Sequence, residues 1–211
     1  MRLLLLSDTH NRHPSLTDLP EADAVLHAGD VSGRGTLPEI GAFLTWFGAL
    51  PYRHKVFIAG NHDFAFERQA AVAEALVPPG VTYLRDQAVS LDGLTVWGAP
   101  WQPWFMDWAF NLERGPALEA AWARIPDDVD VLLTHGPPHG ILDQTSARPP
   151  ERVGCADLRR RIASLSRLRL HTFGHIHEAY GIERHGDVTF VNASTCDLRY
   201  EPRNAPVVVE V

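Results

Sequence analysis

Seven side chains of types that bind divalent metal ions occur in short polar clusters along this sequence. They are Asp8, His10, Asp30, Asn61, His135, His175 and His177. Their ligand atoms are imidazole nitrogens, carboxylate oxygens and an amide oxygen, without a thiolate, which favours Mn, Fe, Co, Ni or Zn in a cysteine-free site. Seven ligands are too many for one tetrahedral ion. With one carboxylate shared, they suit two ions about 3.5–4 Å apart.

The spacing within the clusters supports a metal site. In Asp8-x-His10 and His175-x-His177, an extended backbone would point both side chains to the same side. Glycines that would let the backbone approach the ions lie beside Asp30, Asn61, His135 and His175. Strand-end caps and turns are the alternative explanation for any one cluster, because Asp, Asn and Gly are common there. Five clusters together favour metal binding.

Each cluster lies at or just beyond the end of a short apolar run. These runs are typical of buried strands, and they span Leu3–Leu6, Ala24–Ala28, Val56–Ala59, Val131–Thr134 and Leu170–Phe173. The carboxyl ends of strands in an open α/β sheet form one edge, where binding crevices occur. The sequence therefore predicts that the clusters converge on a single site at that edge.

Helices and hairpins complete an α/β fold. Apolar residues at spacings of three and four predict helices over Leu37–Leu50 and Ala117–Ile125. The dipeptide Asp92-Gly93 predicts a hairpin turn. Further strands are expected at Ala88–Leu91, Leu94–Trp97, Ile182–Arg184, Val188–Val191 and Val207–Val211. Strands that alternate with helices and are interrupted by hairpins favour mixed sheets, and without a linker or repeat we expect one domain over residues 1–211.

Composition limits the class of partner. Hydrophobic residues make up 45% of the 211 residues, which is enough for a core, and the formal net charge is −7. With lysine nearly absent and no basic stripe, an extended nucleic-acid surface is not expected. Cys155 and Cys196 are expected to be reduced thiols. No apolar stretch is long enough for a membrane span or a signal peptide, so we expect a cytoplasmic protein that does not bind membranes.

The ordered motifs resemble the signature of the calcineurin-like metallophosphoesterases. They are Asp8-x-His10, Gly29-Asp30, Gly60-Asn61-His62-Asp63, His135 and Gly174-His175-x-His177. The wider pattern resembles the fetal-brain metallophosphodiesterases and their bacterial relatives. Its matching stretches are Gly98–Phe105, Leu133–Pro138, Phe173–Tyr180 and Asn192–Ser194. The resemblance covers nearly the whole chain and implies two packed, mixed sheets flanked by helices, an α/β/β/α sandwich.

The resemblance also implies a role for each ligand. One metal would be held by Asp8, His10 and His177, the other by Asn61, His135 and His175, and Asp30 would bridge them. His62 would contact the phosphate and donate a proton to the leaving oxygen. The implied reaction is hydrolysis of a phosphate ester by a water, as hydroxide, that bridges two divalent ions, and manganese is the ion expected to support it in assays.

One position departs from the larger phosphatases that the sequence resembles. They have an aspartate three residues after the bridging carboxylate, where it orients the histidine corresponding to His62, but Gly33 stands there in this chain. His62 therefore needs another orienting partner. The next residue, Arg34, matches a phosphate-binding arginine of those phosphatases.

The remaining substrate contacts are expected from loops. Asn61, His62, Arg34 and Arg148 are candidates to contact phosphate, and Trp101 belongs to a dense aromatic stretch, residues 101–110, that offers rings for stacking. Most of these rings are expected to pack over the sheet edge, with one or two in contact with substrate, and burial in a dimer interface is the alternative. The histidines that match no ligand position are expected on the surface or in the core; they are His13, His27, His54, His139, His171 and His185.

The sequence therefore predicts a hydrolase, with a phosphodiesterase as the leading hypothesis. Its partner would be a small phosphate diester, such as a nucleotide or cyclic nucleotide, and the chain would be a monomer or a homodimer. A phosphomonoesterase or a nuclease of the same superfamily is the alternative. A non-catalytic scaffold of the same fold would be expected to have lost metal ligands, and all seven are present.

Overall fold

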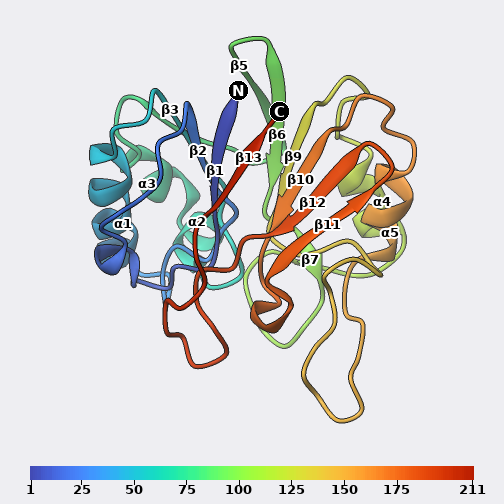
Figure 1. Cartoon of the computed structure of the whole chain (residues 1–211). Helices are drawn as coiled ribbons and strands as arrows, with labels where there is room; N and C mark the ends of the chain where they lie inside the picture. Colours follow the sequence, from blue (N-terminus) through green and yellow to red (C-terminus); the bar gives the residue numbers. More distant parts are fainter.

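The first layer of strands is a five-stranded sheet near the amino terminus. The computed structural model describes residues 1–211 (Figure 1). The strand order is β13 (Val207–Glu210), β1 (Arg2–Leu6), β2 (Ala24–His27), β3 (His54–Phe57) and β4 (Val81–Tyr83). Strands β1 to β4 are parallel, and β13 pairs with β1 in the antiparallel direction.

The second sheet has six strands and antiparallel edges. Its order is β11 (Gly181–His185), β12 (Val188–Asn192), β10 (Leu170–Phe173), β9 (Val131–Thr134), β6 (Leu94–Ala99) and β5 (Gln87–Leu91). The four inner strands are parallel, whereas the edge strands β5 and β11 return as hairpins. A short pair, β7 (Gln102–Pro103) with β8 (Asn111–Leu112), lies apart. The mixed sheets expected from the sequence are therefore confirmed.

Helices cover the outer face of each sheet (Figure 1). The first sheet packs against α1 (Leu37–Ala49), α2 (Phe64–Arg68) and α3 (Ala70–Ala75), and the second against α4 (Pro116–Trp122) and α5 (Ala156–Ile162). Two 3-10 turns, η1 (His13–Ser15) and η2 (His177–Ala179), complete the fold. No helix is both long and apolar enough to span a bilayer.

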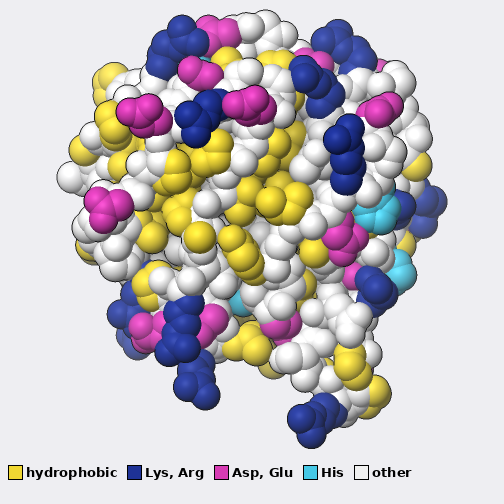
Figure 2. All heavy atoms as spheres, viewed as in Figure 1, with side chains coloured by type: hydrophobic (Ala, Val, Ile, Leu, Met, Phe, Trp, Pro, Cys, Tyr) yellow, Lys and Arg dark blue, Asp and Glu magenta, His cyan; other side chains and the backbone are white.

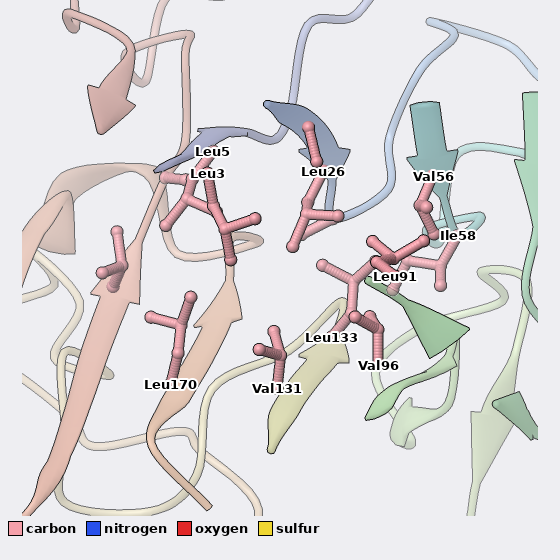
Figure 3. Close-up of a cluster of buried hydrophobic side chains, with 14 of the residues drawn as sticks. Leu3, Leu5, Leu26, Val56, Ile58, Leu91, Val96, Val131, Leu133 and Leu170 are labelled. Atoms are coloured by element: carbon pink, nitrogen blue, oxygen red, sulfur yellow. The ribbon is translucent and has the colours of Figure 1, made fainter. Parts of the chain in front are cut away.

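Strand β1 shows why the chain folds into four layers. Its leucines are fully buried, so both faces of the strand are covered. Leu3 and Leu5 point into the core between the two sheets, where they meet residues of the second sheet such as Val131 (Figure 3). Leu4 and Leu6 point the other way, into the core beneath α1. Because side chains alternate along a strand, a continuous apolar run requires cover on both faces.

Candidate metal centre

Strands of both sheets end at the same edge, and the seven predicted ligands meet there. This is the lower edge in Figure 1, opposite the chain termini. The ligands follow β1, β2 and β3 of the first sheet and β9 and β10 of the second. A bridge between Ser7 and Ser194 joins the two sheets at this edge, and Thr195 N–H donates to the Ser7 carbonyl at 2.8 Å. The edge is therefore a junction of the two sheets.

Asp8, His10 and His177 form the first group of converging ligand atoms, and all three are buried. His10 Nε2 lies 3.2 Å from His177 Nε2, and His177 Nε2 lies 3.3 Å from Asp8 Oδ1. The separation between His10 Nε2 and Asp8 Oδ1 is 3.9 Å. A single cation between these atoms would contact all of them.

Backbone carbonyls determine which nitrogen of each ring is free. His10 Nδ1 lies 3.2 Å from the Ser32 carbonyl, and His177 Nδ1 lies 3.0 Å from the Asp197 carbonyl. Because a carbonyl can only accept, each Nδ1 carries a proton. The two Nε2 atoms, 3.2 Å apart, are therefore the ring nitrogens that can exchange a proton for a metal ion. The donor set therefore fits a divalent metal, and the bonds to carbonyls are typical of metal-binding histidines.

Asn61, His135 and His175 form the second group. Asn61 Oδ1 lies 2.8 Å from His135 Nε2 and 2.7 Å from His175 Nδ1. His135 Nδ1 donates to the Ala28 carbonyl at 2.9 Å, so its Nε2 is again the nitrogen that can exchange a proton for a metal ion. An amide oxygen and imidazole nitrogens that converge in this way also fit a divalent metal.

Asp30 lies between the two groups. Its Oδ2 is 3.6 Å from His10 Nε2 and 3.4 Å from His135 Nε2, and its Oδ1 accepts from the backbone N–H of His62 at 2.8 Å. Asp8 is also held in place: its carboxylate accepts from the backbone N–H of His175 at 3.0 Å and lies 2.8 Å from the Ser194 hydroxyl. Both carboxylates are therefore fixed by the protein.

The charges in the centre are strongly coupled. Burial alone would lower the pKa of His135 and His177, but neighbouring carboxylates raise it to about 9 in each: Asp30 acts on His135, and Asp8 on His177. Burial opposes ionisation of Asp8 and Asp30, yet the adjacent histidines hold the pKa of both carboxyls well below the usual range. Carboxylates that stay ionised suit a cation, which would displace the imidazole protons.

The backbone at the centre is strained. Asp8, His10, Asp30 and His175 have φ values of 51°, 40°, 55° and 68°. This left-handed region costs a non-glycine residue of the order of 1 kcal/mol or more and is concentrated at functional sites. The expectation of an extended backbone is therefore wrong. Asp8 and His10 still converge in the first group, as predicted, but His177 faces the first group and His175 the second.

Glycine is required where the backbone passes behind the carboxylates. A Cβ on Gly174 would lie 1.9 Å from Asp8 Oδ2, and one on Gly60 would lie 2.3 Å from Asp30 Oδ1. Gly136, beside His135, is different, because the nearest atom to its Cβ would be Gln102 Cβ at 3.8 Å. Close packing around the ligands therefore explains Gly60 and Gly174 but not Gly136.

His62 borders the centre and has the orienting partner that the sequence did not reveal. Its Nδ1 lies 2.8 Å from the carbonyl oxygen of Gly33, the residue that stands in place of the usual aspartate. The ring stacks on Trp108, with centroids 4.2 Å apart. Since the carbonyl accepts from Nδ1, Nε2 is the ring nitrogen that remains available for other contacts.

Loop residues form the rim of a cavity of about 170 Å³ over the ligands. Phe105, Trp108, Leu198 and Tyr200 line it, together with Asp30, Asn61, His62, His175 and His177. The Tyr200 ring lies 4.8 Å from that of His10. Trp108 lies within the aromatic stretch identified in the sequence, but Leu198 and Tyr200 lie in an irregular loop without a motif.

The other residues predicted to contact substrate are Arg34, Arg148 and Trp101, and only Arg34 lies beside His62. Arg34 is exposed and lines a shallow depression together with His62. Arg148 is exposed on the loop between β9 and α5 and lines neither that depression nor the metal-centre cavity. Trp101 does not line the cavity either, because its indole N–H donates to Asp86 at 2.8 Å and its ring packs on Phe110. Trp108 and Phe105 are the rings of this stretch at the cavity.

Asp63 has a role that the motif did not indicate. Its buried carboxylate accepts from the backbone N–H groups of Val31, Ser32 and Gly60 at 3.2, 3.0 and 2.8 Å. It thereby ties the loop after β2 to the loop after β3. Its sequence position beside Asn61 and His62 was the available signal, but the acceptor role depends on the positions of the two loops.

Comparisons with known proteins agree with this geometry. A family model described as calcineurin-like phosphoesterase matches residues 1–179. Metallophosphoesterase domain-containing protein 1 of Homo sapiens is 40% identical, over 100% of this chain and 71% of that protein. A UPF0046 protein of Caenorhabditis elegans is 34% identical, over 100% of this chain and 60% of its own length.

Solved structures share the fold. TT1561 of Thermus thermophilus superimposes with a TM-score of 0.60, 16% sequence identity and coverage of 90% of this chain and 88% of that chain. The phosphopantetheinyl hydrolase of Mycobacterium tuberculosis gives a TM-score of 0.62 at 16% identity, covering 94% of this chain and 90% of that one. At this identity the likeness concerns the fold alone.

Proposed function

Since this chain belongs to the calcineurin-like phosphoesterase family, we propose that it is a two-metal phosphodiesterase acting on small phosphate diesters. Asp8, His10 and His177 would hold one ion, and Asn61, His135 and His175 the other. Asp30 would contact both ions. The ions, most simply Mn²⁺ in assays, would activate water and neutralise charge on the phosphate oxygens.

The observation that carries this proposal is the placement of Asp30. Its Oδ2 lies within 3.6 Å of an Nε2 atom from each ligand group, so two sets of ligand atoms meet at one carboxylate. A single-ion site would leave one of these sets without a cation. The presence of the complete ligand set also argues against a scaffold role.

His62 would donate a proton to the leaving group. Its Nδ1 proton is held by the Gly33 carbonyl, and Trp108 supports the face of the ring. To donate from Nε2, the ring would carry a proton on both nitrogens. His62 would thus protonate the oxygen that leaves phosphorus.

The charge around the cavity favours a diester over a monoester. A monoester is a dianion and needs cationic contacts beyond the metals, whereas a diester carries one negative charge. In the depression beside His62, Arg34 is exposed and Arg12 pairs with Glu201 at 3.6 Å. Acidic and basic side chains are interspersed on the face in Figure 2, without an extended basic surface for a nucleic acid. An ester substituent suits the apolar part of the rim, which is formed by Phe105, Trp108 and Leu198.

The test compares bis(4-nitrophenyl) phosphate with 4-nitrophenyl phosphate on metal-stripped protein, with one divalent ion added back at a time. We expect kcat/KM for the diester to exceed that for the monoester by at least about tenfold, which corresponds to about 1.4 kcal/mol of transition-state binding. A preference for the monoester would replace the diesterase with a phosphomonoesterase and would give Arg34 a larger role.

A further inference from the structure

A second cavity borders the metal centre. Its volume is about 190 Å³, and it shares Phe105 and His175 with the cavity that contains His62. Its remaining wall comes from the aromatic stretch, from the start of the loop after β9 and from Val153 and Gly154 before α5. The two cavities are therefore neighbours that Phe105 and His175 separate.

The chemistry of the second cavity suits an apolar, planar group. Pro103, Pro137 and Val153 contribute apolar wall. Its one arginine, Arg114, donates to the carbonyls of Val153 and Gly154 at 2.8 and 2.9 Å, so the cation is directed at the backbone. An apolar cavity of about 150 Å³ is known to hold a benzene molecule. An aryl ring or a single heterocyclic base therefore fits this volume.

The second cavity borders the metal centre at His175 and not at His62. His175 Nδ1 faces Asn61 at 2.7 Å, while the residue also contributes to the wall of the second cavity. His62 and Trp108 line the first cavity and are absent from the second. Trp104 and Phe105 at the mouth are 57% and 55% exposed, so their rings are open to a ligand.

We propose that the second cavity is a substrate subsite for the planar aromatic or heterocyclic ester group that remains on phosphorus after hydrolysis. This inference rests on the proposed diesterase function. Water forms a new bond to phosphorus and releases a proton to solvent, the bond to the leaving oxygen breaks, and that oxygen takes a proton from His62, which solvent then replaces. The bond to the second ester oxygen does not change, and its substituent extends past Phe105, away from His62.

Two diesters with the same leaving group test this assignment. Bis(4-nitrophenyl) phosphate and methyl 4-nitrophenyl phosphate both release 4-nitrophenolate but retain an aryl and a methyl group respectively. Val153→Trp places an indole in the second cavity. We expect it to lower kcat/KM for the aryl diester at least about tenfold more than for the methyl diester, mainly through KM, because a lost apolar contact is worth about 10- to 200-fold.

Control variants separate filling of the cavity from general damage. Val72→Trp makes the same substitution at an exposed position of α3, and should leave both activities as in the parent chain. Leu198→Ala alters the first cavity only, and should change both diesters by a similar factor because they share a leaving group. If Val153→Trp does not fold, as judged by its melting curve, Thr145→Trp fills the same cavity from another wall.

The outcomes distinguish the subsite from the function. If the cavity-filling variant lowers kcat/KM equally for both diesters, the subsite is wrong and the diesterase stands. If the parent protein hydrolyses the monoester but neither diester, the proposed function fails and the subsite fails with it. A selective loss on the aryl diester, with two metals per chain retained, supports both.

Discussion

Asp30 Oδ2 lies 3.6 Å from His10 Nε2 and 3.4 Å from His135 Nε2, so this one carboxylate faces both ligand groups. His135, in contrast, contacts Asn61 of its own group and Asp30. In the proposed two-metal centre, Asp30 would therefore bind both ions and His135 only one. Removing the charge at Asp30 should weaken both sites, whereas removing the His135 ring should weaken one.

Asp30→Asn should lower bound metal from two ions per chain to fewer than one after dialysis, and His135→Ala should leave about one. The loss of kcat/KM for Asp30→Asn should be at least of the order of 10²-fold, because an amide oxygen carries no charge to share. Elemental analysis with a folded-state check by circular dichroism measures this. Retention of two tightly bound ions by Asp30→Asn would contradict the shared role.

The Gly33 carbonyl gives His62 a neutral orienting partner in place of a carboxylate. We expect His62→Ala to lose about 10²–10⁴-fold in rate on a diester with an alkoxide leaving group, and clearly less on bis(4-nitrophenyl) phosphate. A nitrophenolate leaves without protonation, but an alkoxide does not. The measurement is the rate of His62→Ala on both substrates, with its metal content confirmed. An equal loss of rate on the two substrates would mean that His62 only contacts the phosphate.

At the scale of elements, the apolar runs predicted the strands that position the ligands. Strands β9 and β10 have the predicted bounds: β9 is an apolar run that ends at Thr134-His135, and β10 begins at Leu170 and ends at Phe173, before Gly174. Helix α5 was missed because it is one of several short helices and is rich in arginine, with an apolar face limited to Leu158 and Ile162. Strand β4 was missed because it has three residues and none is fully buried.

The rim of the cavity was harder to predict than the ligands. The ligands follow strand ends, which a hydrophobic pattern locates, whereas Leu198 and Tyr200 lie on an irregular segment after β12. That segment is held by hydrogen bonds within the loop and by long-range contacts such as the bond from Arg12 Nε to the Tyr200 carbonyl at 3.1 Å. Contacts between positions 188 residues apart leave no local signal in a sequence.

The strand-end glycines give a prediction at this scale. Gly174→Ala places a Cβ 1.9 Å from Asp8 Oδ2 and 2.2 Å from Ser7 Oγ, and the end of β10 must move. We expect a loss of about 1–3 kcal/mol in the free energy of unfolding, or roughly 2–12 °C in Tm, together with weaker metal binding. Gly136→Ala, whose Cβ meets nothing closer than 3.8 Å, is the matched control. Thermal melts that show equal losses would contradict the steric explanation.

At the scale of the whole molecule, the two sheets bury polar groups along with the apolar core. His171 of β10 is fully buried on the helix-covered face of the second sheet, against Phe173 and Phe190. Its Nε2 lies 2.8 Å from Thr134 Oγ1, and its Nδ1 has no partner. Because the Thr134 hydroxyl donates to the Gly136 carbonyl at 2.8 Å, it accepts from the Nε2–H of the ring. The buried Nδ1 has no acceptor for a second proton, so the ring is neutral.

This neutral ring should make the fold sensitive to acid. Burial lowers the pKa of His171 from the usual 6.5 to about 3. Below pH 6.5 the unfolded chain binds a proton that the folded chain does not. The free energy of unfolding therefore decreases as the pH is lowered from 6.5 to about 3. One such group contributes about 1.4 kcal/mol per pH unit in this range, or about 2 kcal/mol by pH 5.

Urea unfolding of metal-free protein at several pH values between about 7 and 4.5 measures the effect. His171→Leu keeps the apolar contacts and removes the proton site, so its free energy of unfolding should fall less steeply with decreasing pH than that of the parent chain. His139→Gln, at an exposed position, should follow the parent chain. Other buried groups titrate in both proteins and cancel in the difference. Parallel curves for His171→Leu and the parent would mean that the folded chain already accepts the proton at position 171 and that its core opens to water there.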